Sequence, residues 1–199
     1  MKISKYNHAP IEKIKIGTAG KPKILLIDQR FGDFSVSYGM GDEKTFEKML
    51  FVAVTKYPDY EIVVKLHPDA TSGIKSSYFS KSILDKFSSY KNIITIGFDI
   101  NPYSLFEEVE KVFVCSSGVG FEALMAKKEV HCFGMPFYAN RGLTTDYQEV
   151  SYRTKKVSLE TLFYYAYLYL SKYVNPDNGQ RCSLEELVDI FADKIKIKK

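Results

Sequence analysis

The chain has 199 residues and a formal net charge of +4, and 45% of its residues are hydrophobic while 26% are charged. This length and composition predict one folded globular domain, or at most a domain with an appendage, and exclude an intrinsically disordered chain. No apolar stretch approaches the ~20 residues of a membrane span, and no apolar segment follows Met1–Lys5, so neither a transmembrane helix nor a signal peptide is predicted. Three cysteines, an odd number, argue against a disulfide framework and favour a reducing, cytoplasmic compartment.

The basic residues are mostly lysine, since only four of the 28 are arginine. Lysines gather near both ends, at residues 2–23 and 194–199. This distribution favours solubility, with weak attraction to an anionic membrane surface as the alternative. Nucleic-acid binding is not predicted, because the sequence shows no zinc-ligand spacing, helix-turn-helix pattern or aromatic RNA platform.

Short apolar runs rich in β-branched and aromatic residues, bounded by turn formers, predict buried strands. They lie at residues 23–28, 61–66, 92–96, 111–115 and 129–133. Such continuous runs are typical of parallel strands covered on both faces. Their alternation with helical patterns predicts right-handed βαβ units. We therefore expect an α/β fold: a Rossmann-like parallel sheet with helices on both faces, followed by C-terminal helices.

Helix signals separate the predicted strands. Asp42 is predicted to cap a helix, and Asn101 with Pro102 marks the start of another. Residues 158–174 are predicted as a long helix that buries one face, formed by Leu159, Leu162, Phe163, Ala166, Tyr167 and Leu170. Residues 183–186 fit a capping box that opens the last helix. The stretch 134–157 has no clear period and is expected to be a functional loop.

Polar residues follow four of the predicted strands. These segments are residues 28–35, 67–69, 116–122 and 134–138. In a sheet of this class, ligands bind at the carboxyl ends of the strands. We therefore expect one ligand site at this edge, formed by acids, an imidazole, hydroxyls and glycines.

Residues 116–120, Ser-Ser-Gly-Val-Gly, predict a tight turn from a strand into a helix. Small residues and hydroxyls there suit a phosphate, because backbone N–H groups at a helix start attract anions. The alternative is a structural turn in which Ser117 caps the helix. The sequence contains neither the Walker motif nor the G-x-G-x-x-G dinucleotide motif at this turn.

His67 follows a buried strand directly and precedes Pro68, which favours an extended backbone. A donating imidazole there would neutralise a leaving phosphate, and the alternative is a structural histidine. Lys65 is predicted on the same side of the strand. Asp33, beside Gly32, is a candidate nucleophile or general base, with simple turn chemistry as the alternative.

Other chemistry is not predicted. Asp28 lies nearer the strand end and is expected to be structural, and Cys115 is expected to be a buried small side chain rather than a nucleophile. The histidines His8, His67 and His131 lie far apart, and His131 falls inside a strand. No metal site is therefore predicted.

The motifs, in this order, resemble the capsular polysaccharide β-Kdo transferases of the KpsC type. The resemblance is carried by residues 28–36, 65–68, 116–124, 131–138 and 142–146. It implies a fold similar to the donor-binding lobe of a GT-B glycosyltransferase, and it covers the C-terminal donor-binding half of one family module. It also implies transfer of 3-deoxy-D-manno-oct-2-ulosonic acid (Kdo) from CMP-β-Kdo, with retention, to a lipid-linked Kdo acceptor of the capsule linker. No cofactor or metal ion is then required.

The resemblance also implies roles for single residues. Asp33 would be the nucleophile that attacks C2 of Kdo. His67 would stabilise the departing phosphate, and Ser116 and Ser117 would bind that phosphate or the Kdo carboxylate. Glu122 would reach the ribose. The other donor-binding residues implied are Lys65, which would neutralise a carboxylate, Pro68, Gly118, Gly120, Tyr138 and Asp146.

Residues 1–22 are expected to form a partly ordered N-terminal segment, and residues 23–199 a single Rossmann-like CMP-sugar-binding domain. The sequence departs from the family pattern at residues 140–141, where Asn-Arg replaces Gly-Trp. The expected partners are the CMP-sugar donor, a lipid-linked oligosaccharide acceptor and a separate acceptor-binding lobe, with peripheral association at the inner membrane. Two alternatives stay open: a non-catalytic CMP-sugar-binding or scaffold module of a capsule assembly complex, and a transferase that uses another CMP-activated acid.

Overall fold

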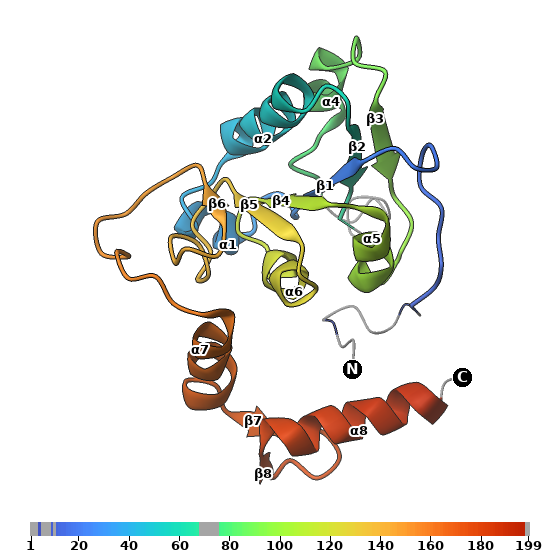
Figure 1. Ribbon diagram of the computed structural model, residues 1–199. Coiled ribbons are helices and arrows are strands. Elements are labelled where there is room, and N and C mark those ends of the chain that lie inside the picture. The colour runs from blue at the N-terminus through green and yellow to red at the C-terminus, as the bar shows by residue number, and fades with distance from the viewer. Residues whose placement is uncertain (1–3, 5–8, 10, 68–75, 198–199) are drawn as a thin grey trace. The chain divides into compact units, whose positions relative to one another are not determined.

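The computed structural model describes residue 4, residue 9 and the ranges 11–67 and 76–197. The chain divides into two compact units, residues 1–156 and residues 157–199 (Figure 1). We expected residues 23–199 to form one domain, but the structure places the last part of this range in a unit of its own. The physical reason is burial, since no described side chain in the range 157–194 is fully buried.

The first unit is built on a sheet whose described strands are all parallel and lie in the order β3-β2-β1-β4-β5-β6. The strands are β1 (Lys23–Ile27), β2 (Glu61–Lys65), β3 (Ile93–Ile96), β4 (Lys111–Val114), β5 (Glu129–Cys132) and β6 (Thr145–Asp146). The strands predicted from the sequence are confirmed, whereas the two-residue β6 is not predicted by any pattern. The strand order reverses between β1 and β4, so the switch point at which such sheets bind ligands lies between their carboxyl ends.

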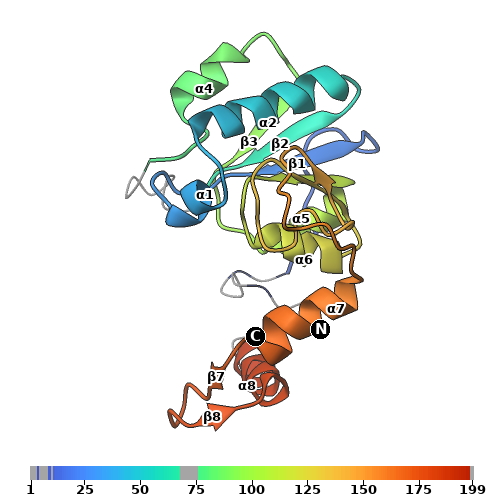
Figure 2. The same cartoon turned by 90° about the vertical axis from the view of Figure 1, so that its left-hand side faces the viewer.

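Helices cover both faces of this sheet, as predicted. Helices α2 and α4 lie on one face, and α5 and α6 lie on the other (Figures 1 and 2). The helices of this unit are α1 (Phe34–Tyr38), α2 (Glu43–Lys56), α4 (Lys81–Lys86), α5 (Pro102–Glu108) and α6 (Val119–Met125).

The predicted helix caps are confirmed. At the start of α2, Asp42 Oδ1 accepts from the N–H of Thr45 at 2.8 Å, and Thr45 Oγ1 accepts from the N–H of Asp42 at 3.1 Å. At the start of α5, Asn101 Oδ1 accepts from the N–H of Tyr103 at 3.1 Å, with Pro102 in the first turn. Each bond satisfies an N–H group that has no partner within its own helix.

The core lies on both faces of the sheet. Alternate strand residues such as Ile24 and Leu26 pack with Phe46 and Met49 of α2, and all four are completely buried. Leu25, which alternates with them and is also completely buried, faces the side covered by α5 and α6. Full burial of one such side chain contributes about 1.5–3 kcal/mol, so the core fixes the register of β1 and thereby the positions of the loops at its end.

The described part of the N-terminal segment packs on the first unit. Asn101 Nδ2 donates to the carbonyl oxygen of Ala9 at 3.2 Å, and the N–H of Glu12 donates to Ser104 Oγ at 2.9 Å. Ile16 is buried at 6% exposure. Ala9 and Glu12 are therefore held against α5 by hydrogen bonds.

The second unit contains α7 (Leu159–Phe163), the π-helix η1 (Tyr164–Tyr169), the hairpin of β7 (Tyr173–Val174) and β8 (Arg181–Cys182), and α8 (Leu184–Ile197). The expectation of one long α-helix over residues 158–174 is wrong, and so is burial of Leu170, which is 71% exposed. The N–H of Leu170 donates to the carbonyl oxygen of Tyr165 at 3.0 Å, five residues back. This wider turn shifts the side chains out of the 3.6-residue period on which the expectation was based.

The predicted start of α8 is confirmed. The N–H of Ser183 donates to Glu186 Oε2 at 2.8 Å, and the N–H of Glu186 donates to Ser183 Oγ at 3.1 Å. These reciprocal bonds form the capping box. Within the ranges that the structure describes, no helix has the length and apolar character needed to cross a bilayer.

Candidate functional site

Three glycines bring the loop after α1 against the ends of β4 and β5. The N–H of Met135 donates to the carbonyl oxygen of Gly39 at 2.6 Å. A Cβ atom on Gly134 would lie 2.6 Å from that oxygen, and one on Gly41 would collide with Cys115 Sγ. These glycines therefore permit an approach that side chains would prevent.

Cys115, at the end of β4, lies inside this junction and is completely buried. Burial raises the pKa of its thiol to about 12. The thiolate is the nucleophilic form of cysteine, so Cys115 is unsuited to nucleophilic catalysis. This agrees with the sequence expectation of a buried small side chain.

The predicted strand-to-helix turn is present at residues 116–120. Ser117 Oγ accepts from the N–H of Val119 at 3.3 Å, and the carbonyl oxygen of Ser117 accepts from the N–H of Gly120 at 3.1 Å. The bond from Val119 N–H to Ser117 Oγ fits the structural turn given as the alternative, although the N-cap position itself is occupied by Gly118, which makes no side-chain cap. Because two N–H groups of the turn are bonded internally, the serine hydroxyls become the important donors of this turn.

Gln29 is the residue that sequence reasoning missed. Its Nε2 donates to Ser35 Oγ and to Ser116 Oγ, both at 3.1 Å, and its Oε1 accepts from the N–H of Ser116 at 3.0 Å. Gln29 is only 5% exposed. It joins the end of β1 to the end of β4 at the switch point. A polar residue directly after a buried strand, in the same place as His67 after β2, was the available signal.

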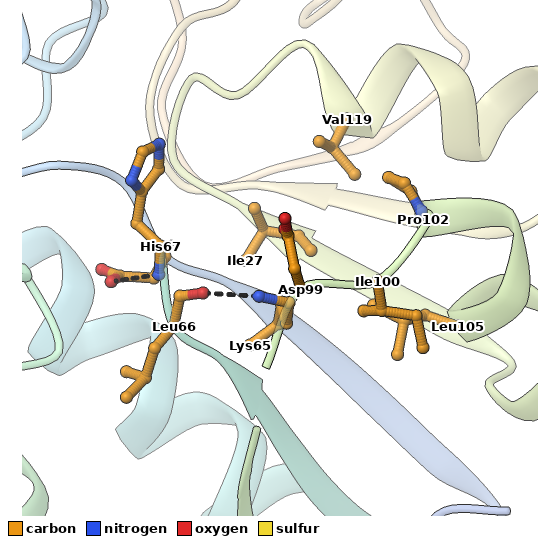
Figure 3. Close-up of a pocket in the computed structure, with 10 residues that line it drawn as sticks. Ile27, Lys65, Leu66, His67, Asp99, Ile100, Pro102, Leu105 and Val119 are labelled. Atoms are coloured by element: carbon orange, nitrogen blue, oxygen red, sulfur yellow. Dashed lines mark hydrogen bonds between the residues drawn. The ribbon is translucent and has the colours of Figure 1, made fainter. Parts of the chain in front are cut away.

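His67 and Lys65 line one cavity, as expected from their predicted position on the same side of the strand. The cavity also contacts Asp99 and Val119, and it has a volume of about 400 Å³ including space open to solvent. Figure 3 shows the imidazole of His67 directed away from Leu66 at the end of β2. Val119 is the first residue of α6 and belongs to the serine turn. The end of β2, which carries the imidazole of His67, and this turn therefore border the same cavity.

Lys65 is buried within this cavity at 9% exposure. Its Nζ donates to the carbonyl oxygen of Leu66 at 2.8 Å. Burial lowers the pKa of the ammonium group, and the negative charges of Asp99 and Asp28 partly oppose that shift. Asp99, which the sequence did not single out, therefore supplies a negative charge beside Lys65. Pro68, the remaining predicted residue of this strand end, lies outside the described residues.

Asp33 stands at the N-terminus of α1. Its Oδ1 accepts from the N–H of Ser35 at 2.9 Å, which caps the helix. The preceding Gly32 has a φ of +77°, a conformation that favours glycine. The turn chemistry weighed as the alternative is thus present, and it places the half-buried carboxylate of Asp33 beside Ser35.

The remaining predicted residues lie at different places in the first unit. Glu122, in the first turn of α6, accepts from Ser4 Oγ at 2.6 Å. Tyr138 is completely buried, contacts Gly120, and donates from its Oη to the carbonyl oxygen of Ser117. It therefore supports the turn from behind, whereas we expected it to line the ligand site. Gly118 is exposed, with open space around its Cα.

Asp146 and Asn140 organise the loop between β5 and β6. Asp146 Oδ2 accepts from the N–H of Asn140 at 3.0 Å, and Asp146 Oδ1 accepts from Thr144 Oγ1 at 2.7 Å. Asn140 has a φ of +56° and stands where the resembled family has glycine. Asparagine tolerates this left-handed conformation, so the replacement conserves the loop backbone.

The sequence model of the capsule polysaccharide biosynthesis proteins matches residues 2–180. The chain belongs to this family.

In the described ranges, the structure brings together no group of three or more His, Cys, Asp or Glu residues that could hold a metal ion.

Two solved structures are similar to this chain. KpsC, beta Kdo 2,4 transferase, of Thermosulfurimonas dismutans shares 38% identity with a TM-score of 0.85, over 94% of this chain and 57% of that chain. The beta Kdo 2,7 transferase of the same KpsC shares 32% identity with a TM-score of 0.73, over 92% of this chain and 56% of that one. The Rossmann-like fold and the resemblance stated from the sequence are confirmed.

Curated relatives are also similar in sequence to this chain. The capsule polysaccharide modification protein LipA of Neisseria meningitidis serogroup B is 38% identical over 96% of this chain. The lipopolysaccharide-processing protein LpsZ of Rhizobium meliloti is 30% identical over 96% of this chain. The chain spans only 28% of LipA and 42% of LpsZ.

Proposed function

We propose that this chain binds CMP-Kdo and forms the donor-binding part of a retaining glycosyltransferase that transfers Kdo to a lipid-linked acceptor of a capsule linker. The observation that carries the proposal is the likeness to the KpsC Kdo 2,4 transferase, at 38% identity over 94% of this chain. The ligand edge of the sheet supports it, since an imidazole, a buried ammonium group and serine hydroxyls border the switch point.

The phosphate of CMP is assigned to the space between the end of β2 and the turn before α6. His67 and the hydroxyl of Ser117 would donate to the phosphate oxygens, and the buried ammonium group of Lys65 would add positive charge. Such preorganised donors stabilise the leaving group without a metal ion. We assign Glu122 to the ribose, and the exposed Gly118 to the close approach of the backbone to the ligand, whereas Gly120 is buried and makes room for Tyr138.

Asp33 is assigned as the nucleophile. Its carboxylate would attack C2 of Kdo while the bond between C2 and the phosphate oxygen breaks, and CMP leaves with the electron pair. An acceptor hydroxyl would then attack C2 from the opposite side, lose its proton to solvent and displace the carboxylate of Asp33. Two inversions give net retention.

The proposed partners are the CMP-sugar donor, a lipid-linked acceptor and a separate acceptor-binding lobe. A separate acceptor-binding lobe would supply the second wall of the reaction site. We propose a cytoplasmic protein, peripheral at the inner membrane, where the lysine-rich ends would approach anionic lipids. Because the proposed phosphate site uses no metal ion, an added chelator is expected to leave donor binding unchanged.

Isothermal titration calorimetry of the 199-residue chain with CMP and CMP-Kdo tests the proposal, with UMP as the control nucleotide. We expect both cytidine ligands to bind and UMP to bind at least tenfold more weakly. No binding of CMP-Kdo at millimolar concentration would refute the donor site. Binding without release of CMP, in the presence of acceptor and acceptor lobe, would instead identify the non-catalytic module that we weighed as the alternative.

A further inference from the structure

The amide of Gln29 controls two hydroxyls at the switch point. Nε2 lies 3.1 Å from Ser35 Oγ and 3.1 Å from Ser116 Oγ, and Gln29 is 5% exposed. Ser35 lies on α1 and Ser116 follows β4, so a single buried side chain joins three segments of the chain. Since a buried amide needs partners for its donors and acceptor, this arrangement is fixed by its hydrogen bonds.

The orientation of this amide follows from the backbone. The N–H of Ser116 can only donate, and it lies 3.0 Å from Oε1 of Gln29. Oε1 must therefore face Ser116 N, and Nε2 must face the two hydroxyl oxygens. Both N–H bonds of Nε2 are then used, one for each serine.

This orientation decides what the two hydroxyls can offer a ligand. Each Oγ accepts from Gln29, so each hydroxyl uses its own proton as a donor, and Ser116 Oγ donates it to Gln29 Oε1 in the structure. Ser116 Oγ lies 3.3 Å from Oε1, the longest contact in the group, and its proton can turn from there to a ligand. Ser35 is exposed and Ser116 is half-buried. Two adjacent O–H donors suit a group with two acceptor oxygens.

We propose that Ser35 and Ser116 form a hydroxyl-lined site for a carboxylate group, that Gln29 is its positioning residue, and that the ligand is the carboxylate on the anomeric carbon of the donor sugar. The assignment rests on the proposed function and adds Ser35 and Gln29 to it. The carboxylate carbon of a 2-ulosonic acid is bonded directly to C2, the carbon that is attacked.

Stereochemistry favours the carboxylate over the phosphate. A nucleophile attacks C2 on the side opposite the leaving phosphate, at about 3–3.5 Å in a reactive complex. The N–H of Ser35 is bonded to Asp33 Oδ1 at 2.9 Å, so Ser35 lies on the side of the nucleophile. The carboxylate of the sugar remains bonded to C2 and lies close to the nucleophile, whereas the phosphate leaves C2 on the opposite side.

The first test compares Ser35→Ala with Ser37→Ala. Both serines are exposed on α1, and Ser37 Oγ donates to the carbonyl oxygen of Phe34 in its own helix at 3.2 Å. We expect Ser35→Ala to weaken CMP-Kdo binding about tenfold and CMP binding less than twofold, because CMP lacks the carboxylate. Ser37→Ala should change neither affinity.

The outcomes separate this inference from the proposed function. If the wild-type chain binds neither CMP nor CMP-Kdo, the proposed function fails and the carboxylate assignment fails with it. If wild type binds both and Ser35→Ala binds CMP-Kdo normally, only the carboxylate site is refuted. Equal weakening of CMP and CMP-Kdo would also refute it, because the anion at Ser35 would then be the phosphate.

Gln29→Glu tests the positioning role. A glutamate accepts from Ser116 N–H and from both hydroxyls, which turns their protons away from the ligand. We expect a loss of CMP-Kdo affinity larger than that of Ser35→Ala, and less than a twofold further loss when Ser35→Ala is added. Independent, multiplying losses would refute the coupling. If Gln29→Glu does not fold, the comparison of Ser35→Ala with Ser37→Ala still decides whether the site exists.

Discussion

The carboxylate of Asp28, at the end of β1, accepts a hydrogen bond from the backbone N–H of His67, at the end of β2, at 3.0 Å. It also accepts from Ser77 Oγ at 2.6 Å and from the N–H of Phe79 at 3.2 Å. Burial raises the pKa of the Asp28 carboxyl group, and these hydrogen bonds oppose the shift. Asp28 therefore fixes the backbone of His67 at the ligand edge.

Replacement of this carboxylate should destabilise the first unit. Asp28→Ala leaves the N–H groups of His67 and Phe79 without their acceptor, and we expect the free energy of unfolding to fall by about 2–4 kcal/mol. Urea unfolding followed by circular dichroism measures it. The control is Asp85→Ala, which removes an exposed ion pair with Lys81 and should cost less than about 0.5 kcal/mol. Equal stability of the two variants would contradict the role of Asp28.

Gly120 has no room for a side chain. A Cβ atom there would collide with Tyr138 Oη and lie 2.9 Å from Tyr138 Cζ and 3.0 Å from Val114 Cγ2. We expect Gly120→Ala to lower the melting temperature by several degrees, which corresponds to about 1–3 kcal/mol of overpacking. Gly118→Ala is the matched control, because open space surrounds Gly118.

A second variant identifies the group responsible for the clash at Gly120. Tyr138→Phe removes the hydroxyl group, so the double variant Gly120→Ala with Tyr138→Phe should recover part of the lost stability. The remaining ring carbon still lies close, and full recovery is not expected. A double variant whose losses simply add would show that Tyr138 Oη is not the obstacle.

His131 should make stability depend on pH. It is 2% exposed, and its Nε2 lies 2.8 Å from Glu129 Oε1. Burial lowers the pKa of the imidazole, the nearby positive charges of Lys111 and Lys56 act in the same direction, and Glu129 opposes them. The folded state thus favours the neutral imidazole. Its stabilising contribution is complete above the unfolded pKa of about 6.5 and is lost as pH falls through the folded pKa.

The measurement is the free energy of unfolding between about pH 5 and pH 8, for wild type and for His131→Gln. Wild type should lose more stability than the variant as pH falls below the unfolded pKa, because only wild type takes up this proton on unfolding. Identical slopes in this range would refute the assignment. Tyr147, whose Oη lies 3.5 Å from Nδ1, is unchanged in both proteins.

The sequence could predict the parts of the fold that depend on local signals. Strands β1 to β5 are continuous apolar runs, and the caps at Asp42, Asn101 and Ser183 use side chains close in sequence. Elements α1 and β6 were not predictable in this way. The loop after α1 is held by Gly39 against residue 135, and β6 consists of two residues that pair with β5. Such elements depend on contacts between distant segments.

The same distinction applies to the site. His67, Asp33 and Ser116 could be singled out as candidates because each follows a predicted strand, and the order of the motifs matches a known family. The position of Gln29 after a strand gave the same signal, but its role could not be predicted, because its partner Ser116 lies 87 positions along the chain and only the fold brings them together. Tyr138 lies in a motif whose resemblance implies contact with the donor, but its ring is completely buried. Burial of a single side chain could not be predicted from the motif.

Asp33 combines two roles that one pair of variants can separate. As the N-cap of α1 it accepts from the N–H of Ser35, and asparagine caps helices about as well as aspartate. As the proposed nucleophile it needs a carboxylate, which asparagine lacks. Asp33→Asn should therefore keep wild-type stability and CMP affinity, whereas Asp33→Ala should lose about 1 kcal/mol of unfolding free energy with the cap.

Both variants should fail to form the glycosyl-enzyme intermediate. After incubation with CMP-Kdo, intact-mass spectrometry should detect wild-type protein carrying one Kdo residue, and should detect only the unmodified mass for Asp33→Asn and Asp33→Ala. Ser37→Ala, on the same helix and outside the proposed site, should form the adduct as wild type does. An adduct that persists in Asp33→Asn would place the nucleophile elsewhere, because that variant keeps the helix cap and removes only the nucleophilic carboxylate.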